Sequence, residues 1–212
     1  MEQNIIIENT RLYQLCLPII ALNAPSMIEE KTPLELYQIA CRGGPGSQIA
    51  IKKLKEIYPE NKMTDETIRQ TVNDYYKSVT NTRYQRCGPI EFWDVSEVTD
   101  MSSLFQGFNF NEDLSQWDVS SVTTMNHMFC YCRKFNRDLS KWDVSSVTNM
   151  SYMFCHCNSF NRDLSQWDVS SVTNMDSMFY NCNRFNSDLS QWLVSSVTNM
   201  DCMFYNCSHF NS

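Results

Sequence analysis

Residues 142–165 read WDVSSVTNMSYMFCHCNSFNRDLS, and close copies of this stretch fill the second half of the chain. Five tryptophans, spaced 24, 25, 25 and 25 residues apart, mark the copies: Trp93, Trp117, Trp142, Trp167 and Trp192. A fixed period between about 20 and 50 residues is typical of proteins built from stacked structural repeats. We therefore predict about five coils, one per repeat, stacked so that like side chains lie above one another in the interior.

The pattern inside each repeat predicts its local structure. Residues 142–144 alternate apolar and polar side chains, which is typical of a short extended segment with one face turned inward. Four apolar residues follow at positions i, i+3, i+4 and i+7, the spacing of one helix face: Met150, Met153, Phe154 and Cys157. Each coil is thus predicted to run from a strand through a helical turn into a return loop, so that the fold class is α/β.

The repeat can be written Asp-Leu-Ser-x-Trp-Asp-Val-Ser-Ser-Val-Thr-Asn-Met-x-x-Met-Phe-x-x-Cys-x-x-Phe-Asn. It resembles the repeat of the BspA-type leucine-rich-repeat surface proteins, a domain of unknown function, over roughly residues 90–212. The resemblance implies a leucine-rich-repeat-like solenoid that binds other proteins, often in adhesion at surfaces. We read no signal peptide, wall anchor or transmembrane segment in this chain, so an intracellular location is favoured over a surface one.

Helix signals dominate the first ninety residues. Thr32 and Pro33 are suited to begin a helix over residues 34–41, and further helices are predicted at 49–58 and 64–78. We expect residues 1–90 to form a helical N-terminal cap and residues 91–212 the repeats, with the third helix covering Trp93. Residues 32–58 also resemble a single ankyrin-type helical hairpin.

Charge and cysteine content restrict the possible ligands. The chain has 24 acidic and 17 basic residues, and residues 91–212 carry 14 acidic against 6 basic ones, which disfavours nucleic acid and anionic membranes as partners. The Cys-x-Cys pairs at 130/132 and 155/157 make a zinc site an alternative hypothesis. Two columns of aspartates make calcium binding another. The favoured interpretation is packed, reduced thiols and aspartates that cap turns, with no metal or cofactor.

The remaining chemistry argues for recognition rather than catalysis. His127, His156 and His209 occupy three different repeat positions, and the serines recur as structural positions, so no nucleophile–base pair is indicated. The sequence therefore predicts a non-enzymatic protein-binding scaffold. Its candidate contact residues are variable, outward-facing positions: His127, Arg133, Tyr152, Asn158, Tyr180 and Tyr205.

A structural role in assembly is the alternative function. Leu193 takes the place of a columnar aspartate in the last repeat, where no polar capping segment follows. An uncapped end exposes apolar residues, so self-association into a two-fold homodimer is a second hypothesis. Its predicted contact residues are Leu193, Phe204 and Phe210.

Overall fold

The computed structural model describes residues 31–42, 44, 46–77 and 87–211, which belong to two compact units divided between Ile57 and Tyr58. In the first unit, helices α2 (Pro33–Arg42) and α3 (Ser47–Ile57) contact each other and bury Leu36 and Leu54. Both helices lie within two residues of their predicted bounds. Thr32 caps α2, since its hydroxyl accepts the Glu35 N–H and the Glu35 carboxylate accepts the Thr32 N–H.

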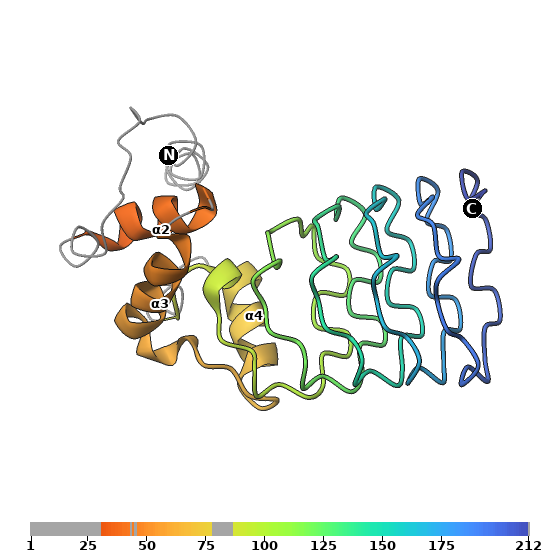
Figure 1. Cartoon of the computed structure of the whole chain (residues 1–212), viewed down its shortest axis with the longest axis horizontal. Helices are drawn as coiled ribbons and strands as arrows, with labels where there is room; N and C mark the ends of the chain where they lie inside the picture. The colour runs from red at the N-terminus through yellow and green to blue at the C-terminus, as the bar shows by residue number, and fades with distance from the viewer. Residues whose placement is uncertain (1–30, 43, 45, 78–86, 212) are drawn as a thin grey trace. The chain divides into compact units, whose positions relative to one another are not determined.

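The second unit opens with short helical segments and continues into the repeats (Figure 1). These segments are η2 (Pro59–Asn61), α4 (Ile68–Lys77) and η3 (Ile90–Phe92). Helix α4 buries Ile68 and Val72 in the same core as Trp93, and the Tyr75 ring meets the Trp93 ring edge-on at 6.0 Å. Helix α4 thus shares the core of the repeats and belongs to the same compact unit, which begins at Tyr58.

Helix α4 begins four residues later than predicted. The Thr64 N–H donates to the Thr67 hydroxyl at 2.9 Å, and the Thr67 N–H donates back to the Thr64 carbonyl at 3.1 Å. Threonine side chains that bond nearby backbone groups favour turns over helix interiors. Residues 64–67 therefore form a hydrogen-bonded turn, and the helix follows it.

Successive coils lie side by side in chain order, shown from green to blue in Figure 1. Isolated parallel bridges join them at one position per coil: Asp100, Thr124, Asn149, Asn174 and Asn199. The Phe154 ring stacks on Phe129 at 5.6 Å and on Phe179 at 5.7 Å. The indole N–H of the buried Trp167 donates to the Leu139 carbonyl of the preceding coil at 2.9 Å. Side chains of one repeat position therefore meet their equivalents in neighbouring coils.

The predicted strand and helical turn are wrong in detail. Residues 151–156 form consecutive turns instead of a helix, with Tyr152 at φ 57° and His156 at φ 60°. The N–H groups of Met150, Tyr152, Phe154 and His156 donate to carbonyls of the next coil at 2.8–2.9 Å, and not to the preceding helical turn. The strand is reduced to the bridging residue, here Asn149. The intervening N–H groups of Met153, Cys155 and Cys157 donate to carbonyls three residues earlier, so bonds to the next coil alternate with turns inside the segment.

The aspartate columns cap turns, as the favoured interpretation expected. Asp143 Oδ1 accepts the Ser145 N–H at 3.1 Å and the Ser145 hydroxyl at 2.6 Å. Those hydrogen bonds lower the pKa of the Asp143 carboxyl. Within the residues that the structure describes, no three His, Cys, Asp or Glu side chains are grouped closely enough to hold a metal ion.

Two side chains of the cap region take the place of a coil before the first repeat. Within the repeats, the Thr123 N–H and hydroxyl both donate to the Thr99 carbonyl. Thr99 makes the same two donations to the Asp65 carboxylate, at 2.8 and 2.6 Å. The Arg69 guanidinium donates to the carbonyls of Asp100 and Ser102. Asp65 and Arg69 thus supply the acceptor and donors that a preceding coil would offer.

The Asp65 contact predicts a pH-dependent contribution to stability. Partial burial raises the pKa of Asp65, but the hydrogen bonds from Thr99 and Asp100 outweigh it and hold this pKa below its usual value. The contribution of Asp65 to the free energy of unfolding is therefore complete at pH values above the unfolded-state pKa of about 4. It is lost as the pH falls through the lower pKa of the folded state. We expect Asp65→Asn to destabilise the protein at pH 7, and this deficit to shrink between pH 5 and pH 3 in urea titrations. Glu66→Gln is the control, and a constant Asp65→Asn deficit would refute the assignment.

Candidate functional site

Two rows of side chains project from backbone positions in the left-handed region. In the coil that contains residue 125, His127 and Tyr131 have φ of 59° and 65°, and the equivalent residues of later coils repeat these values. Positive φ is uncommon outside glycine, so its recurrence four residues apart in each coil sets a fixed direction for these side chains. We name the rows by their members. The first row is His127, Tyr152, Ser177 and Cys202; the second row is Tyr131, His156, Asn181 and Asn206.

Ring stacking holds each row together. His127 stacks on Tyr152 in the first row with centroids 4.6 Å apart, and Tyr131 stacks on His156 in the second row at 4.4 Å. The second row continues by hydrogen bonding, since the Asn181 amide lies 3.3 Å from the His156 ring nitrogens. Because stacked rings cover each other's faces, their polar edges remain available to a partner.

The first row, together with Tyr131 and His156 of the second row, forms the walls of a groove of about 560 Å³. Its floor includes Cys130 and Cys155, which occupy one repeat position in adjacent coils and are 2% and 4% exposed. The other residues that line it are Gln106, Tyr180 and members of the two rows. The groove is therefore concave, with thiols below and imidazole and phenol groups on both sides.

Burial disfavours the charged forms of three ionisable groups in the groove. Burial lowers the pKa of His127, although Asp176 opposes the shift, and burial together with Arg133 lowers the pKa of His156. The hydrogen bond between the Cys155 and Cys130 thiols, followed by burial, raises the pKa of the Cys155 thiol far above its ordinary value. A protonated thiol is a poor nucleophile. The groove thus offers hydrogen-bonding groups and apolar surface to a ligand.

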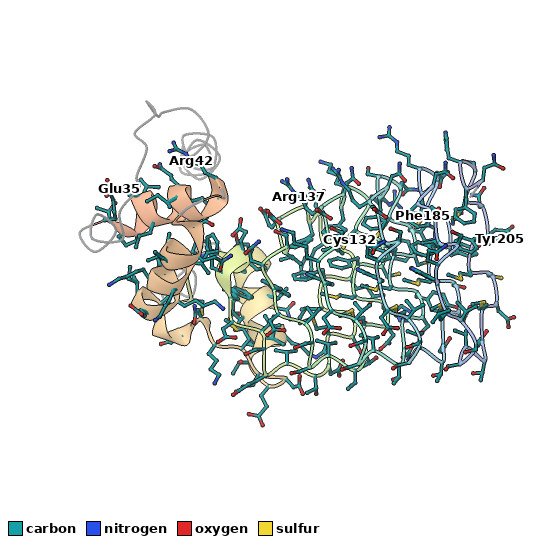
Figure 2. All side chains as sticks on the ribbon, viewed as in Figure 1. Glu35, Arg42, Cys132, Arg137, Phe185 and Tyr205 are labelled. Carbon is teal, nitrogen blue, oxygen red and sulfur yellow. The ribbon has the colours of Figure 1, made fainter. Side chains whose placement is uncertain are left out.

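Three of the six predicted contact residues line this groove, namely His127, Tyr152 and Tyr180. Tyr205 stacks on Tyr180 at 4.9 Å and is 59% exposed, and Figure 2 shows it on the last coil, at the end of the stack. It extends the aromatic surface beyond the groove lining.

Arg133 and Asn158 do not line the groove. Arg133 is exposed, and the Asn158 amide donates to the Asn181 carbonyl and to Asn183 Oδ1, each at 3.2 Å. Asn158 therefore serves contacts between coils. Tyr131 and His156 line the groove but were not among the predicted contact residues, although both vary between repeats and each lies between the cysteines of a Cys-x-Cys pair.

The cysteines of each Cys-x-Cys pair have different surroundings. Cys132 and Cys157 are fully buried, and their thiols donate to the carbonyls of Phe105 and Phe129, each at 2.9 Å. Cys130 and Cys155 line the groove instead. The inward cysteines are thus packed thiols, as the favoured interpretation held.

The residues predicted for self-association differ in exposure. Leu193 is 69% exposed, whereas Phe204 and Phe210 are half-buried and stack on Phe179 and Phe185 of the preceding coil. Leu193 is therefore the member of this set that projects most from the last coil.

Comparison with known proteins covers the repeats and part of the cap. A family model described as "Mycoplasma protein of unknown function, DUF285" matches residues 73–168 and 142–212, about two thirds of the chain. The chain belongs to the DUF285 family. The DUF285 match begins inside α4 and leaves out α2 and α3. No curated protein and no solved structure matches the chain. In the part of the chain that the structure describes, no helix is long and apolar enough to cross a membrane.

Proposed function

We propose that this DUF285 protein is a non-enzymatic protein-binding scaffold whose groove is the contact surface. The observation that carries the proposal is the pair of stacked rows, His127 with Tyr152 and Tyr131 with His156, on either side of a concave surface. Tyrosine combines an apolar ring with a hydrogen-bonding group and is enriched among residues that dominate binding energy. Fixing these rings by stacking reduces the entropy that they lose when a partner binds.

Variation among the repeats supports recognition at this surface. The interior keeps Phe129, Phe154 and Phe179 at one position, whereas the first row changes from histidine to tyrosine, serine and cysteine along the stack. A constant interior with a changing surface row gives each coil a different contact chemistry on the same backbone. Extended binding surfaces of stacked repeats are built in this way.

We also assign the repeats to the BspA-type leucine-rich-repeat class, as a solenoid of about five coils. The 25-residue period, the parallel bridges between coils and the aromatic stacks support this assignment. The acidic balance of the chain disfavours nucleic acid, and the hydrogen-bonding and apolar groups that line the groove favour a polypeptide partner. In this proposal the residues in contact with the partner are His127, Tyr131, Tyr152, His156 and Tyr180.

The test removes one wall of the groove. We expect the double variant Tyr131→Ala/His156→Ala to lose protein partners that the intact chain retains in quantitative affinity purification, with at least a tenfold weaker Kd for a purified partner. Truncation of interface anchors typically costs about 2 kcal/mol or more each, which is more than tenfold in Kd.

The control is the double variant Gln116→Ala/Gln166→Ala, which removes two exposed side chains at another repeat position. It should retain the same partners, and both double variants should keep the melting temperature of the parent. Equal retention by the groove variant and the parent would contradict the proposal.

A further inference from the structure

Basic residues are confined to one part of each coil. All six lysines and arginines of residues 91–212 belong to the segment between the inward cysteine of a coil and the next tryptophan. Four of them, with a single aspartate, lie within residues 133–141. The rest of residues 91–212 carries 13 acidic and two basic residues. A local positive surface therefore interrupts an acidic stack of coils.

We name this surface the basic strip. It consists of the four basic residues of one coil and an arginine of the next coil: Arg133, Lys134, Arg137, Lys141 and Arg162. All five are exposed, whereas Phe135 and Leu139 between them are buried. The buried residues fix which side of the segment faces the core. The basic side chains thus lie along one edge of the stack, where Figure 2 shows Arg137.

The preceding coil holds two arginines of the strip in place. Arg137 Nε donates to the Asn111 carbonyl at 2.7 Å, and Arg162 Nε donates to the Asn136 carbonyl at 2.8 Å. Arg137 and Arg162 occupy one repeat position, and the phenylalanine rings two residues before them stack at 5.9 Å. The same contact therefore positions a guanidinium group in each of two adjacent coils.

Ion pairs do not neutralise the strip. Among the described residues, no carboxylate lies within ion-pair distance of its five basic side chains. Asp138, which lies within the strip, uses its Oδ1 to accept the Ser140 N–H at 2.9 Å. Glu112 stands one coil before Arg137 and is half-buried; burial raises its pKa, although Arg137 opposes the shift. The positive charges of the strip thus remain available to an anionic partner.

We propose that the basic strip binds an acidic segment of a protein partner, in a contact separate from the groove. Guanidinium groups in adjacent coils repel each other, and carboxylates that accept N–H bonds from both offset this repulsion. Charge complementarity selects the occupant, because the strip is the positive part of an otherwise acidic stack. A long polyanion such as nucleic acid would extend over the acidic coils on either side, which repel it. A short run of Glu or Asp within a polypeptide fits the strip alone.

Binding of labelled octa-glutamate to the full-length chain, followed by fluorescence anisotropy at low salt, tests the proposal. We expect octa-glutamate to bind and octa-glutamine not to bind. The double variant Arg137→Gln/Arg162→Gln should weaken the Kd about tenfold or more, because it removes charge-assisted hydrogen bonds from both coils. Lys134→Gln/Lys141→Gln should also weaken it, and this variant decides if the melting temperature shows that the arginine variant is unfolded.

The matched control is Lys52→Gln/Lys55→Gln, which removes the same charge from α3. It should bind octa-glutamate as the parent does. The groove variant Tyr131→Ala/His156→Ala should do so too, which distinguishes failure of the strip from failure of the groove. Unchanged binding by the folded strip variants, or no binding of octa-glutamate at millimolar concentration, overturns the proposal. Tighter binding of an oligodeoxythymidylate of equal charge would overturn it in favour of nucleic acid.

Discussion

Replacing Phe154 by alanine should lower the free energy of unfolding by about 3–5 kcal/mol, the usual cost of removing a fully buried aromatic ring. Phe154 is 0% exposed, and its ring stacks on Phe160 at 4.2 Å as well as on both neighbours in its column. The coils above and below are fixed by hydrogen bonds, so the cavity cannot close by local collapse. Urea or thermal unfolding followed by circular dichroism measures the effect.

The matched control is Phe204→Ala in the same column. Phe204 is half-buried and stacks on Phe179 and Phe210, with no coil beyond it in the described structure. Burial of roughly half the surface predicts a smaller cost, on the order of 1–2 kcal/mol. Equal losses for the two variants would show that the contribution of a phenylalanine to stability does not depend on its burial between two coils.

These two variants probe the feature that the sequence predicts best. The tryptophan period and the recurring phenylalanines identify which side chains meet, because stacked copies bury identical positions together. They do not determine how the backbone travels between those positions. The spacing of Met150, Met153 and Phe154 fits a helix, yet their coil uses alternate N–H groups to reach the next coil. Side-chain periodicity reports burial, and here it cannot distinguish a helix from consecutive turns.

The residues that line the groove were predicted only in part for the same reason. His127, Tyr152 and Tyr180 were identified because they vary and were expected to face outward. The second wall depends on the left-handed backbone at Tyr131 and His156, a conformation that only a few per cent of residues other than glycine adopt. Conformation imposed by the neighbouring coils places these rings, so a single repeat does not reveal them.

Replacing Arg69 by alanine should lower the free energy of unfolding by about 1–3 kcal/mol, the cost of leaving hydrogen-bonded backbone groups without their charged partner. The guanidinium reaches both the Asp100 and the Ser102 carbonyl and pairs with the Asp100 carboxylate at 3.0 Å. Arg69→Lys should recover only part of the loss, because one ammonium group lacks the planar fork that spans two acceptors. Chemical denaturation at pH 7 measures the free energies of unfolding of the parent protein, Arg69→Ala and Arg69→Lys.

Arg162→Ala is the appropriate control, since Arg162 also donates to a backbone carbonyl, that of Asn136 at 2.8 Å, but from an exposed position between internal coils. Its removal should change stability by no more than about 0.5 kcal/mol, as for most surface substitutions. If Arg69→Ala were equally mild, the carbonyls of the first coil would be satisfied by water alone. The charge at Arg69 would then be unnecessary for ending the stack, and α4 would cap it through apolar contact with Trp93 only.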